Sequence, residues 1–451
     1  MGILGRHYLH TVVSNFVMKF VIGLVISVAT ARALGPAGRG EYGLVVLIVN
    51  TVTLLFNFGI PSTNTYFIAQ KKFGKEHLYR SSVTLACVLS ILSFVVLGLL
   101  YEFDLSYILF PTEKLTAPII ASLGIIPVVF FNLFAQGIVI GENKIELNNY
   151  ISLAGQGALA LTLGVLYVVG VLSVTSAVVL YAFSHVLTLA MFIRTSCPSL
   201  STIVATRNRW SDYSAMLKFS GTIHIGNLTQ FFNYRLDSFI VNFFMGTGAV
   251  GLYLQASLLG ETLWLLSSSM AWVLLPTVAG RHEKSKEIAV KATVATFLVS
   301  IIGGIAAFVA GPWLIVALFG DKFVGSITPF LILIPGVVIF SITNVLATYL
   351  TGAGRPGYNA AIAFISFVFT IVFDILLIPR YGIAGAAIAS GISYTTSTIL
   401  TVAVFVRISA LSWAESVTIV KSMRGDVRSI VARLRQPIEV GGENSETSKK
   451  K

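Results

Sequence analysis

Charge is scarce in this sequence. Asp, Glu, Lys and Arg make up 11% of the 451 residues, whereas soluble domains carry about 25%. So few charged side chains do not solvate a globular surface, which excludes an ordinary soluble protein. Cysteine is scarce too, because Cys87 and Cys197 are the only two. They do not suggest the disulfide framework of small secreted domains, and we interpret both as structural bystanders.

Sequence patterns of enzymes are also missing. There is no G-x-x-x-x-G-K-[ST] loop, which argues against ATP hydrolysis in this chain. No cysteine and histidine spacing typical of a metal site occurs. An oligosaccharide ligase or polymerase needs a large loop outside the cell, but the longest loop, residues 194–218, is predicted on the cytoplasmic side. We therefore expect neither an enzyme nor a bound cofactor.

Long apolar runs are abundant instead. The chain is 55% hydrophobic, and many runs approach the ~20 residues that a helix needs to cross a bilayer. Continuous runs favour helices over the alternating strands of a barrel. The sequence therefore predicts an all-α polytopic membrane protein with twelve transmembrane helices. The predicted spans are 12–31, 41–61, 81–101, 118–140, 150–170, 173–193, 219–245, 250–279, 290–311, 325–350, 358–379 and 382–407.

Basic residues predict the orientation of these spans. If the N-terminus, every second loop and the C-terminal tail share one side, that side holds 24 of the 31 Lys and Arg residues. The other side holds 5, and Lys19 and Arg235 remain inside the spans. Because basic loops stay in the cytoplasm, both termini are predicted to be cytoplasmic. The net charge of +12 follows mostly from this asymmetry, so it needs no nucleic-acid partner.

A glycine-rich stretch, "ALGPAGRGEYG" at 33–43, occurs twice in related form. "LGPAGRGEY" (34–42) aligns with "MGTGAVGLY" (245–253) at an offset of 211, and "GENKIELN" (141–148) aligns with "GAGRPGYN" (352–359) at the same offset. The second glycine copy has no arginine where the first has Arg39. This favours a helix-hairpin turn over a phosphate cradle, since glycine allows close backbone approach.

The repeat predicts the domain organisation. We expect a six-helix lobe at 1–210, a second at 211–407 in the same membrane orientation, and a tail at 408–451. Transporters are commonly built from such repeats, with the substrate between them. In the tail, apolar and basic residues recur at helical spacing from 411 to 435. They predict an amphipathic helix on the membrane surface, followed by a disordered end.

Three motifs carry a family resemblance. "ARALGPAGRGEYGL", "YRLDSFIVNFFMGTGAVGLYLQA" and "LIPRYGIAGAAIASGISY" resemble the Wzx-type polysaccharide exporters. These belong to the superfamily of multidrug-and-toxin extruders and lipid II flippases. The resemblance covers residues 1 to about 407. It implies two lobes around a central cavity in the cytoplasmic membrane, where the protein flips a polyprenyl-pyrophosphate-linked oligosaccharide. It also implies membrane lipids as partners, and a glycan polymerase or glycosyltransferases as further candidates.

Charged residues inside the spans are the candidate site residues, because a buried charge in a membrane usually marks function. Arg235 and Asp237 are two residues apart, so they project to nearly opposite sides of one helix. Lys19 and Arg235 are the buried cations and suit a pyrophosphate. We predict that they bind it, with Asn15 and Arg32 nearby. Structural ion pairs with neighbouring helices remain the alternative, and Glu261 fits a rim position as well as a buried one.

A second set of candidates concerns a coupling cation. Lipid II flippase relatives build a sodium site from an acid on the seventh helix, polar residues on the eleventh, and a carbonyl and hydroxyl on the twelfth. The residues here that match that spacing are Asp237, Thr370, Asp374, the Ala386 carbonyl and Ser390. The resemblance therefore implies a site for Na⁺ as the coupling ion. H⁺ on a carboxylate is one alternative, and transport driven by the membrane potential is another.

Two other functions remain open from the sequence. A drug or metabolite antiporter of the same superfamily would favour aromatic and acidic residues in its cavity, whereas buried cations favour an anionic substrate. A non-transporting scaffold for glycan synthesis would not need charges inside the membrane.

Overall fold

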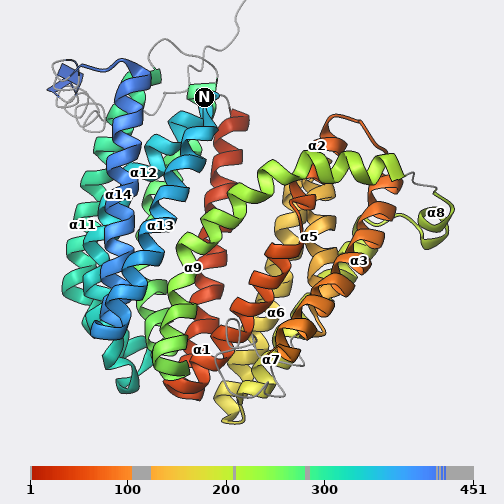
Figure 1. Ribbon diagram of the computed structural model, residues 1–451, viewed down its shortest axis with the longest axis horizontal. Helices are drawn as coiled ribbons and strands as arrows, with labels where there is room; N and C mark the ends of the chain where they lie inside the picture. The colour runs from red at the N-terminus through yellow and green to blue at the C-terminus, as the bar shows by residue number, and fades with distance from the viewer. Residues whose placement is uncertain are drawn as a thin grey trace, which may run out of the picture.

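The computed structural model describes residues 3–103, 123–206, 210–279 and 285–412, together with 415, 418–419 and 421–422. Within these residues the regular elements are all helices (Figure 1). They are α1 (Ile3–Phe56), α2 (Ile60–Ala69), α3 (Lys75–Glu102), α5 (Ile126–Gly141), α6 (Ile145–Val169), α7 (Val174–Thr195), α8 (Leu200–Ala205), α9 (Trp210–Glu261), α10 (Trp264–Ala279), α11 (Ser285–Phe319), the 3₁₀-helix η2 (Asp321–Ser326), α12 (Ile327–Gly352), α13 (Pro356–Tyr381) and α14 (Ile383–Ser409).

The helices confirm a polytopic membrane fold. Nine helices of the described chain are long and apolar enough to cross a bilayer. Two of them, α1 and α9, each contain one predicted span and the first part of the next, on either side of a bend. The predicted span 250–279 is divided between the end of α9 and α10, and the start of the predicted span 118–140 lies outside the described residues. The total of twelve spans therefore stays a prediction.

The bends in α1 and α9 lie at equivalent glycines. Gly35 has φ 66° and ψ −177°, and Gly246, 211 residues later, has φ 79° and ψ −179°. This conformation favours glycine because a side chain is strained at positive φ. Figure 1 shows α1 running down to the bend and returning upwards. The prediction of a helix-hairpin turn is confirmed at both copies.

Helix boundaries follow the same offset through the rest of the chain. α5 ends at Gly141 and α12 at Gly352, while α6 begins at Ile145 and α13 at Pro356. In the loops between them, positive φ occurs at Asn143 (60°) and at Gly354 (76°), again 211 residues apart. The two halves of the chain therefore repeat one fold.

The two repeats meet through their glycines. A Cβ added to Gly40 would lie 1.8 Å from the carbonyl oxygen of Thr247, and one added to Gly251 would lie 1.9 Å from that of Pro36. Gly40 corresponds to Gly251 and Pro36 to Thr247 at the offset of 211, so each repeat makes the same contact with the other. This reciprocity is the property of a pseudo-two-fold axis.

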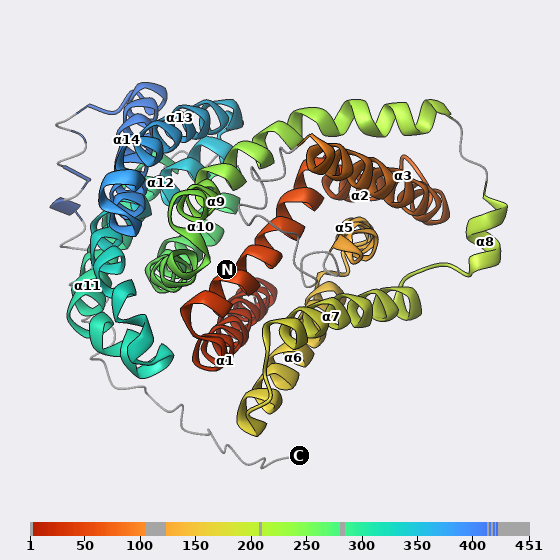
Figure 2. The ribbon, with the colours of Figure 1, turned by 60° about the horizontal axis from the view of Figure 1, so that its bottom comes forward.

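We call the end of the molecule with Gly35 and Gly246 the glycine end, and the end with loops 70–75, 142–145 and 353–356 the basic end. In Figure 1 the basic end is at the top, where α1 begins and α14 ends. Figure 2 brings the glycine end forward and shows α1 beside α9 and α10. An even number of membrane passes returns the chain to the side where it began. The twelve predicted spans therefore agree with the start of α1 and the end of α14 lying at the same end of the molecule.

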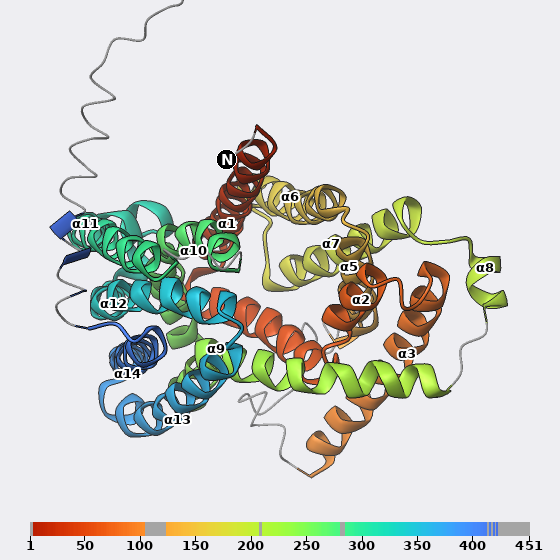
Figure 3. The same ribbon diagram turned by 90° about the horizontal axis from the view of Figure 1, so that it is seen from above.

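Helix α9 joins the helices of the first repeat to those of the second. Seen from above, α9 runs along one edge of the molecule from the side of α3 to that of α13 (Figure 3). Its first turns pack on the first repeat, where Met216 is fully buried and the His224 ring bonds to the carbonyl of Leu55 at 3.1 Å. Helix α9 therefore begins at the predicted lobe boundary of 210/211, but its first turns, which belong to the second predicted lobe, pack against the first one.

The outward faces of the helices suit a lipid environment. Many large apolar side chains are exposed on them, such as Val168 on α6 at 82% and Val309 on α11 at 75%. Exposed apolar surface on this scale is a mark of a membrane protein. By contrast, the exposed Lys and Arg residues of the described chain lie mainly toward the basic end, in its loops and at the adjoining helix ends.

The sidedness of the fold is testable by cysteine labelling. With Cys87 and Cys197 replaced by serine, we expect a membrane-impermeant maleimide on intact cells to label K322C at the glycine end but not K75C at the basic end. The reason is the asymmetry of basic residues, which holds the basic end in the cytoplasm. Labelling of K75C from outside before permeabilisation would reverse the predicted topology.

The described part of the tail packs on the second repeat. Lys286 and Glu415 form an ion pair of 2.7 Å, and hydrogen bonding by Lys286 lowers the pKa of Glu415. Leu411 and Ile419 are buried beside them. Most of the predicted amphipathic helix at 411–435 lies outside the described residues.

Candidate functional site

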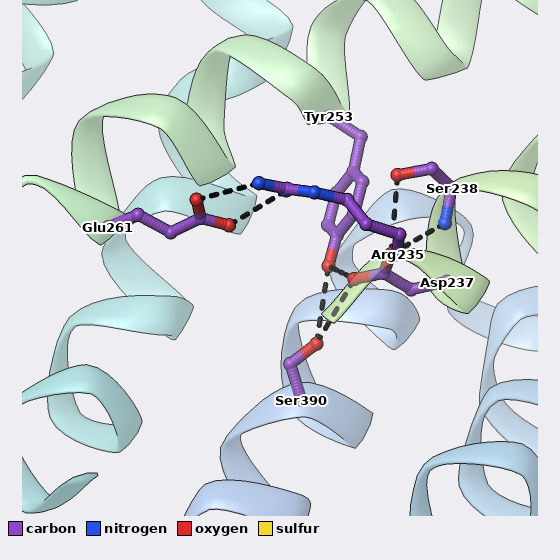
Figure 4. A network of polar contacts seen from close by, with 6 residues as sticks. All are labelled: Arg235, Asp237, Ser238, Tyr253, Glu261 and Ser390. Atoms are coloured by element: carbon purple, nitrogen blue, oxygen red, sulfur yellow. Dashed lines mark hydrogen bonds and ion pairs between the residues drawn. The ribbon is translucent and has the colours of Figure 1, made fainter. Parts of the chain in front are cut away.

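Asp237 on α9 is a buried carboxylate with a nearly complete hydrogen-bond shell (Figure 4). One carboxylate oxygen accepts from the backbone N–H of Ser238 at 2.6 Å. The other accepts from the hydroxyl of Tyr253 at 2.5 Å and from that of Ser390 on α14 at 3.4 Å. The side chain is held by α9 before and after its glycine bend and by α14. These neutral donors orient the carboxylate without neutralising its charge.

Arg235 points away from Asp237 toward Glu261, as Figure 4 shows. The two terminal nitrogens of Arg235 lie 2.9 and 3.1 Å from the two oxygens of Glu261. This bidentate pair is geometrically strong, and the side chains are only 35% and 22% exposed. Glu261 is therefore partly buried and paired, which removes the rim position from the alternatives. The prediction that Arg235 and Asp237 face opposite environments is confirmed.

Asp374 on α13 has a different environment. It is fully buried, and neither of its carboxylate oxygens has a hydrogen-bond partner among the described residues. Thr370 contacts Asn233, and Asp374 and Asp237 each lie four residues further along their helices, so the two carboxyl groups occupy corresponding levels of α13 and α9. An ionised carboxylate without a partner is costly inside a protein. Asp374 is therefore the candidate among the described residues for holding a proton or another cation.

Thr370 lies one turn before Asp374 but bonds elsewhere. Its hydroxyl oxygen lies 2.9 Å from Asn233 Oδ1 and 2.8 Å from Ser393 Oγ, within hydrogen-bond distance of both. Ser393 also lies 3.2 Å from Asn233 Oδ1. We call Asn233, Thr370 and Ser393 the hydroxyl–amide cluster. It lies directly next to the two carboxylates along the same three helices.

The five residues predicted for the cation are thus only partly brought together. Asp237 and Ser390 are in contact, Asp374 lies near Asp237, and Thr370 belongs to the neighbouring hydroxyl–amide cluster. Ala386 is fully buried on α14, one turn from Ser390. Oxygen ligands of this kind suit a hard monovalent cation, and the free oxygens of Asp374 fit that role. The cation site itself stays a prediction.

Of the four residues predicted for pyrophosphate, the structure describes the side chains of Arg32 and Arg235, and these two have different hydrogen-bond partners. The side chains of Asn15 and Lys19 lie outside the described ones, although their backbone belongs to α1. The guanidinium of Arg32 donates to the carbonyls of Ala317 and Leu318, the latter at 2.8 Å, and its role in binding pyrophosphate stays a prediction. It caps the C-terminus of α11, where carbonyls lack helical partners. Arg32 therefore joins the two repeats at the glycine end.

Sequence reasoning missed several partners in this region. Tyr253, the last residue of the second glycine stretch, is absent from the predicted site, yet it makes the shortest bond to Asp237. Asn233 and Ser393 are absent from it as well. For these two the spacing is a usable signal, because Asn233 lies four residues from Asp237 and Ser393 lies three from Ser390.

Comparison with known proteins agrees with this architecture. A family model described as polysaccharide biosynthesis protein matches residues 5–282, and the MatE model matches residues 277–376. The chain is 25% identical over 207 residues to the probable low-salt glycan biosynthesis flippase Agl15 of Haloferax volcanii, covering 42% of this chain and 44% of that protein. It is 25% identical over 281 residues to the probable flippase AglR of the same organism, covering 58% and 55%.

Solved structures share the fold at low sequence identity. The lipid II flippase MurJ in an inward closed conformation has a TM-score of 0.74 and 14% identity, covering 94% of this chain and 92% of that one. An inward-facing multidrug resistance MATE transporter of the MOP superfamily has a TM-score of 0.71 and 14% identity, covering 87% and 95%. The chain spans about half the length of the curated relatives above. With more than half of its residues matched by the family model, it belongs to the polysaccharide biosynthesis protein family.

Proposed function

We propose that this protein is a flippase that moves a polyprenyl-pyrophosphate-linked oligosaccharide from the inner to the outer leaflet of the cytoplasmic membrane. The observation that carries the proposal is the partly buried Arg235–Glu261 pair, together with an Asp374 that has no partner among the described residues, within a repeat-built membrane fold. Family membership and the names of the relatives give the substrate class. Both termini would then lie in the cytoplasm, with the basic end.

The physical problem for such a flippase is the polar head group. Each unpaired hydroxyl costs about 2–7 kcal/mol to bring into hydrocarbon, so even one sugar is prohibitive. A polar path between the two repeats, open to one side at a time, removes this cost. The structure is joined at the glycine end by the Gly40 and Gly251 contacts and by Arg32. This arrangement supports a state that receives substrate from the basic end.

Arg235 is suited to hold the pyrophosphate even with Glu261 in place. A guanidinium has five N–H donors, and Glu261 occupies two. The remaining donors are available to a ligand, because the Arg235 side chain is 35% exposed. Glu261 then fixes the plane of the guanidinium, and Lys19 on α1 would supply the second cation.

Cation coupling at Asp374 is the other half of the proposal. Moving one cation inward across about 100 mV contributes about 2.3 kcal/mol, which is roughly 50-fold in the transport equilibrium. Asp374 needs a positive charge, and Asp237 adds to the local negative potential. The coupling ion in this proposal is Na⁺ or H⁺.

Translocation in proteoliposomes tests the coupling. We expect D374N to insert and fold but to lose gradient-driven accumulation of the lipid-linked oligosaccharide, by roughly 50-fold at about 100 mV. The matched control is D321N, an aspartate exposed on η2 at the glycine end. Unchanged rate and ion dependence in D374N would assign a structural role to Asp374. Failure of the parent protein to move any lipid-linked sugar, with export of organic cations instead, would favour the antiporter.

A further inference from the structure

A polar cavity of about 450 Å³ lies inside the second repeat, among α9, α10, α12, α13 and α14. Amides and hydroxyls line much of its wall, and none of its described lining residues is charged. Thr351 and Asn359, which line it, flank the loop 353–356 of the basic end. A cavity of this size with many polar partners holds water. It therefore extends an aqueous region from the basic end into the membrane-spanning part of the repeat.

The inner end of this cavity is the hydroxyl–amide cluster. Asn233 lines the cavity and at the same time accepts hydrogen bonds from Thr370 and Ser393. Ser397, one turn from Ser393 toward the basic end, also lines the cavity. Three helices thus contribute one side chain each to a single polar constriction.

The two carboxylates lie one helical turn beyond the constriction. Asp237 follows Asn233 by four residues on α9, and Asp374 follows Thr370 by four on α13. α14 runs in the opposite direction, so Ser390 occupies the corresponding level on it. One turn is about 5.4 Å, so a cation at the hydroxyl–amide cluster is a single step away from Asp374.

The lipid side offers no comparable path. Along α13 the exposed side chains next to Asp374 are apolar, with Val372 at 45%, Ile375 at 52% and Leu376 at 50% exposure. A cation crossing this surface would lose its hydration without any polar partner. In contrast, hydroxyl and amide oxygens replace hydration water step by step, as in ion-selective pores.

We propose that the cavity is the path by which the coupling cation passes from Asp374 to the basic end, and that the hydroxyl–amide cluster is its gate. This inference rests on the cation coupling proposed above. The neutral wall admits cations without trapping them, and the hydroxyls of Thr370 and Ser393 rotate to present their lone pairs. The carboxylates beyond the gate supply the attraction. The substrate path between the repeats and the ion path within the second repeat are then separate.

The first test asks whether water reaches the cavity from the basic end. In a chain with Cys87 and Cys197 replaced by serine, a small cationic thiol reagent is added to the basic-end side of S397C or I399C. Ser397 is 5% exposed in the cavity, whereas Ile399, two residues away, is 64% exposed on the apolar outer face. We expect S397C to react at least about tenfold faster, because the charged reagent is excluded from hydrocarbon. Equal or reversed rates would overturn the path.

The second test examines the gate with Ag⁺, a thiol-reactive ion of a size that suits a monovalent cation path. S390C places a thiol beyond the hydroxyl–amide cluster. We expect Ag⁺ from the basic end to modify it, and N233L to slow that reaction about tenfold or more, since leucine fills the position without a polar atom. N132L is the control, because it removes a buried amide that donates to the His185 carbonyl in the first repeat.

These tests separate the path from the coupling. Unchanged Ag⁺ reactivity in N233L, or equal modification from the glycine end, would overturn the gate even if D374N abolishes coupled transport. Retained labelling of S397C in the N233L background shows that the cavity is intact. If D374N keeps full ion dependence while both labelling results hold, the cavity reaches the carboxylates but the proposed coupling is wrong.

Discussion

Replacing Gly40 with alanine is expected to weaken the closed glycine end strongly. The added Cβ would lie 1.8 Å from the Thr247 carbonyl oxygen and 2.9 Å from the Gly251 nitrogen, both of them backbone atoms. Backbone atoms do not move aside as a flexible side chain does, so the two repeats must separate. Overpacking costs typically about 1–3 kcal/mol, and a cost of about 2–3 kcal/mol shifts a conformational equilibrium roughly 30- to 150-fold.

Thiol accessibility measures this shift. Ser27 lies between the repeats, where its hydroxyl donates to Gln255 at 2.6 Å. In the G40A background we expect S27C to react faster with a reagent added at the glycine end, and transport to fall. G251A should behave in the same way, because the added Cβ would lie against the carbonyl oxygen of Pro36, just as a Cβ added at Gly40 would lie against that of Thr247. The matched control is G157A on α6, where a Cβ has no neighbour within 4 Å.

Either of two results would contradict the claim that the glycine contacts keep this end closed. One is parental transport by G40A with S27C still protected. The other is an equal effect of G157A, which would indicate a general response to added volume in a helix.

The largest effect on substrate handling is expected at Arg235. We expect R235A to abolish flipping, because it removes the proposed pyrophosphate ligand and leaves Glu261 without its partner. Breaking a buried ion pair costs about 3–5 kcal/mol, and the 35% exposure of Arg235 reduces that figure through solvent screening. R235K should recover only part of the activity, since a point charge does not reproduce the bidentate fork.

The partner variant distinguishes anion binding from a structural pair. E261Q keeps the guanidinium, so transport should persist at a reduced rate, whereas R235A/E261Q should fold stably and remain inactive. Proteoliposome flipping and thermal unfolding in detergent are measured for each variant. Recovery of flipping in R235A/E261Q would show that the pair is structural and that Arg235 does not bind the substrate. Asp237 is not the partner to test here, because its bonds go to Ser238, Tyr253 and Ser390.

Much of the fold was predictable because it depends on local or periodic properties. Apolar runs identify helices, and the glycines at offset 211 identify the repeat and its two bends. Arg235 and Asp237 were assigned to opposite sides from helix geometry alone. The positive φ at Gly35 and Gly246 then follows from a requirement that only glycine meets easily.

The site was less predictable because its contacts join distant helices. Arg235 and Glu261 are 26 residues apart on the two arms of α9, and Thr370 meets Asn233 over 137 residues. Hydrophobic periodicity identifies a buried face but not the neighbour that covers it. Arg32 shows the same limit, since its role as a cap depends on the end of α11, which lies 286 positions further along the chain.

The two copies of the repeat differ at the proposed cation site, and this difference affects how much charge one transport cycle would carry. At the offset of 211, the counterparts of Asp237, Asp374 and Ser390 in the first half are Ile26, Leu163 and Val179. An ancestor of two identical subunits would have carried such a site twice or not at all. The proposed cation site occurs in one copy, so one transport cycle would move only the cation charge that this one site holds. A pyrophosphate moving outward contributes roughly 4–5 kcal/mol per 100 mV by itself. Membrane voltage would then act more on the cargo than on the co-transported ion.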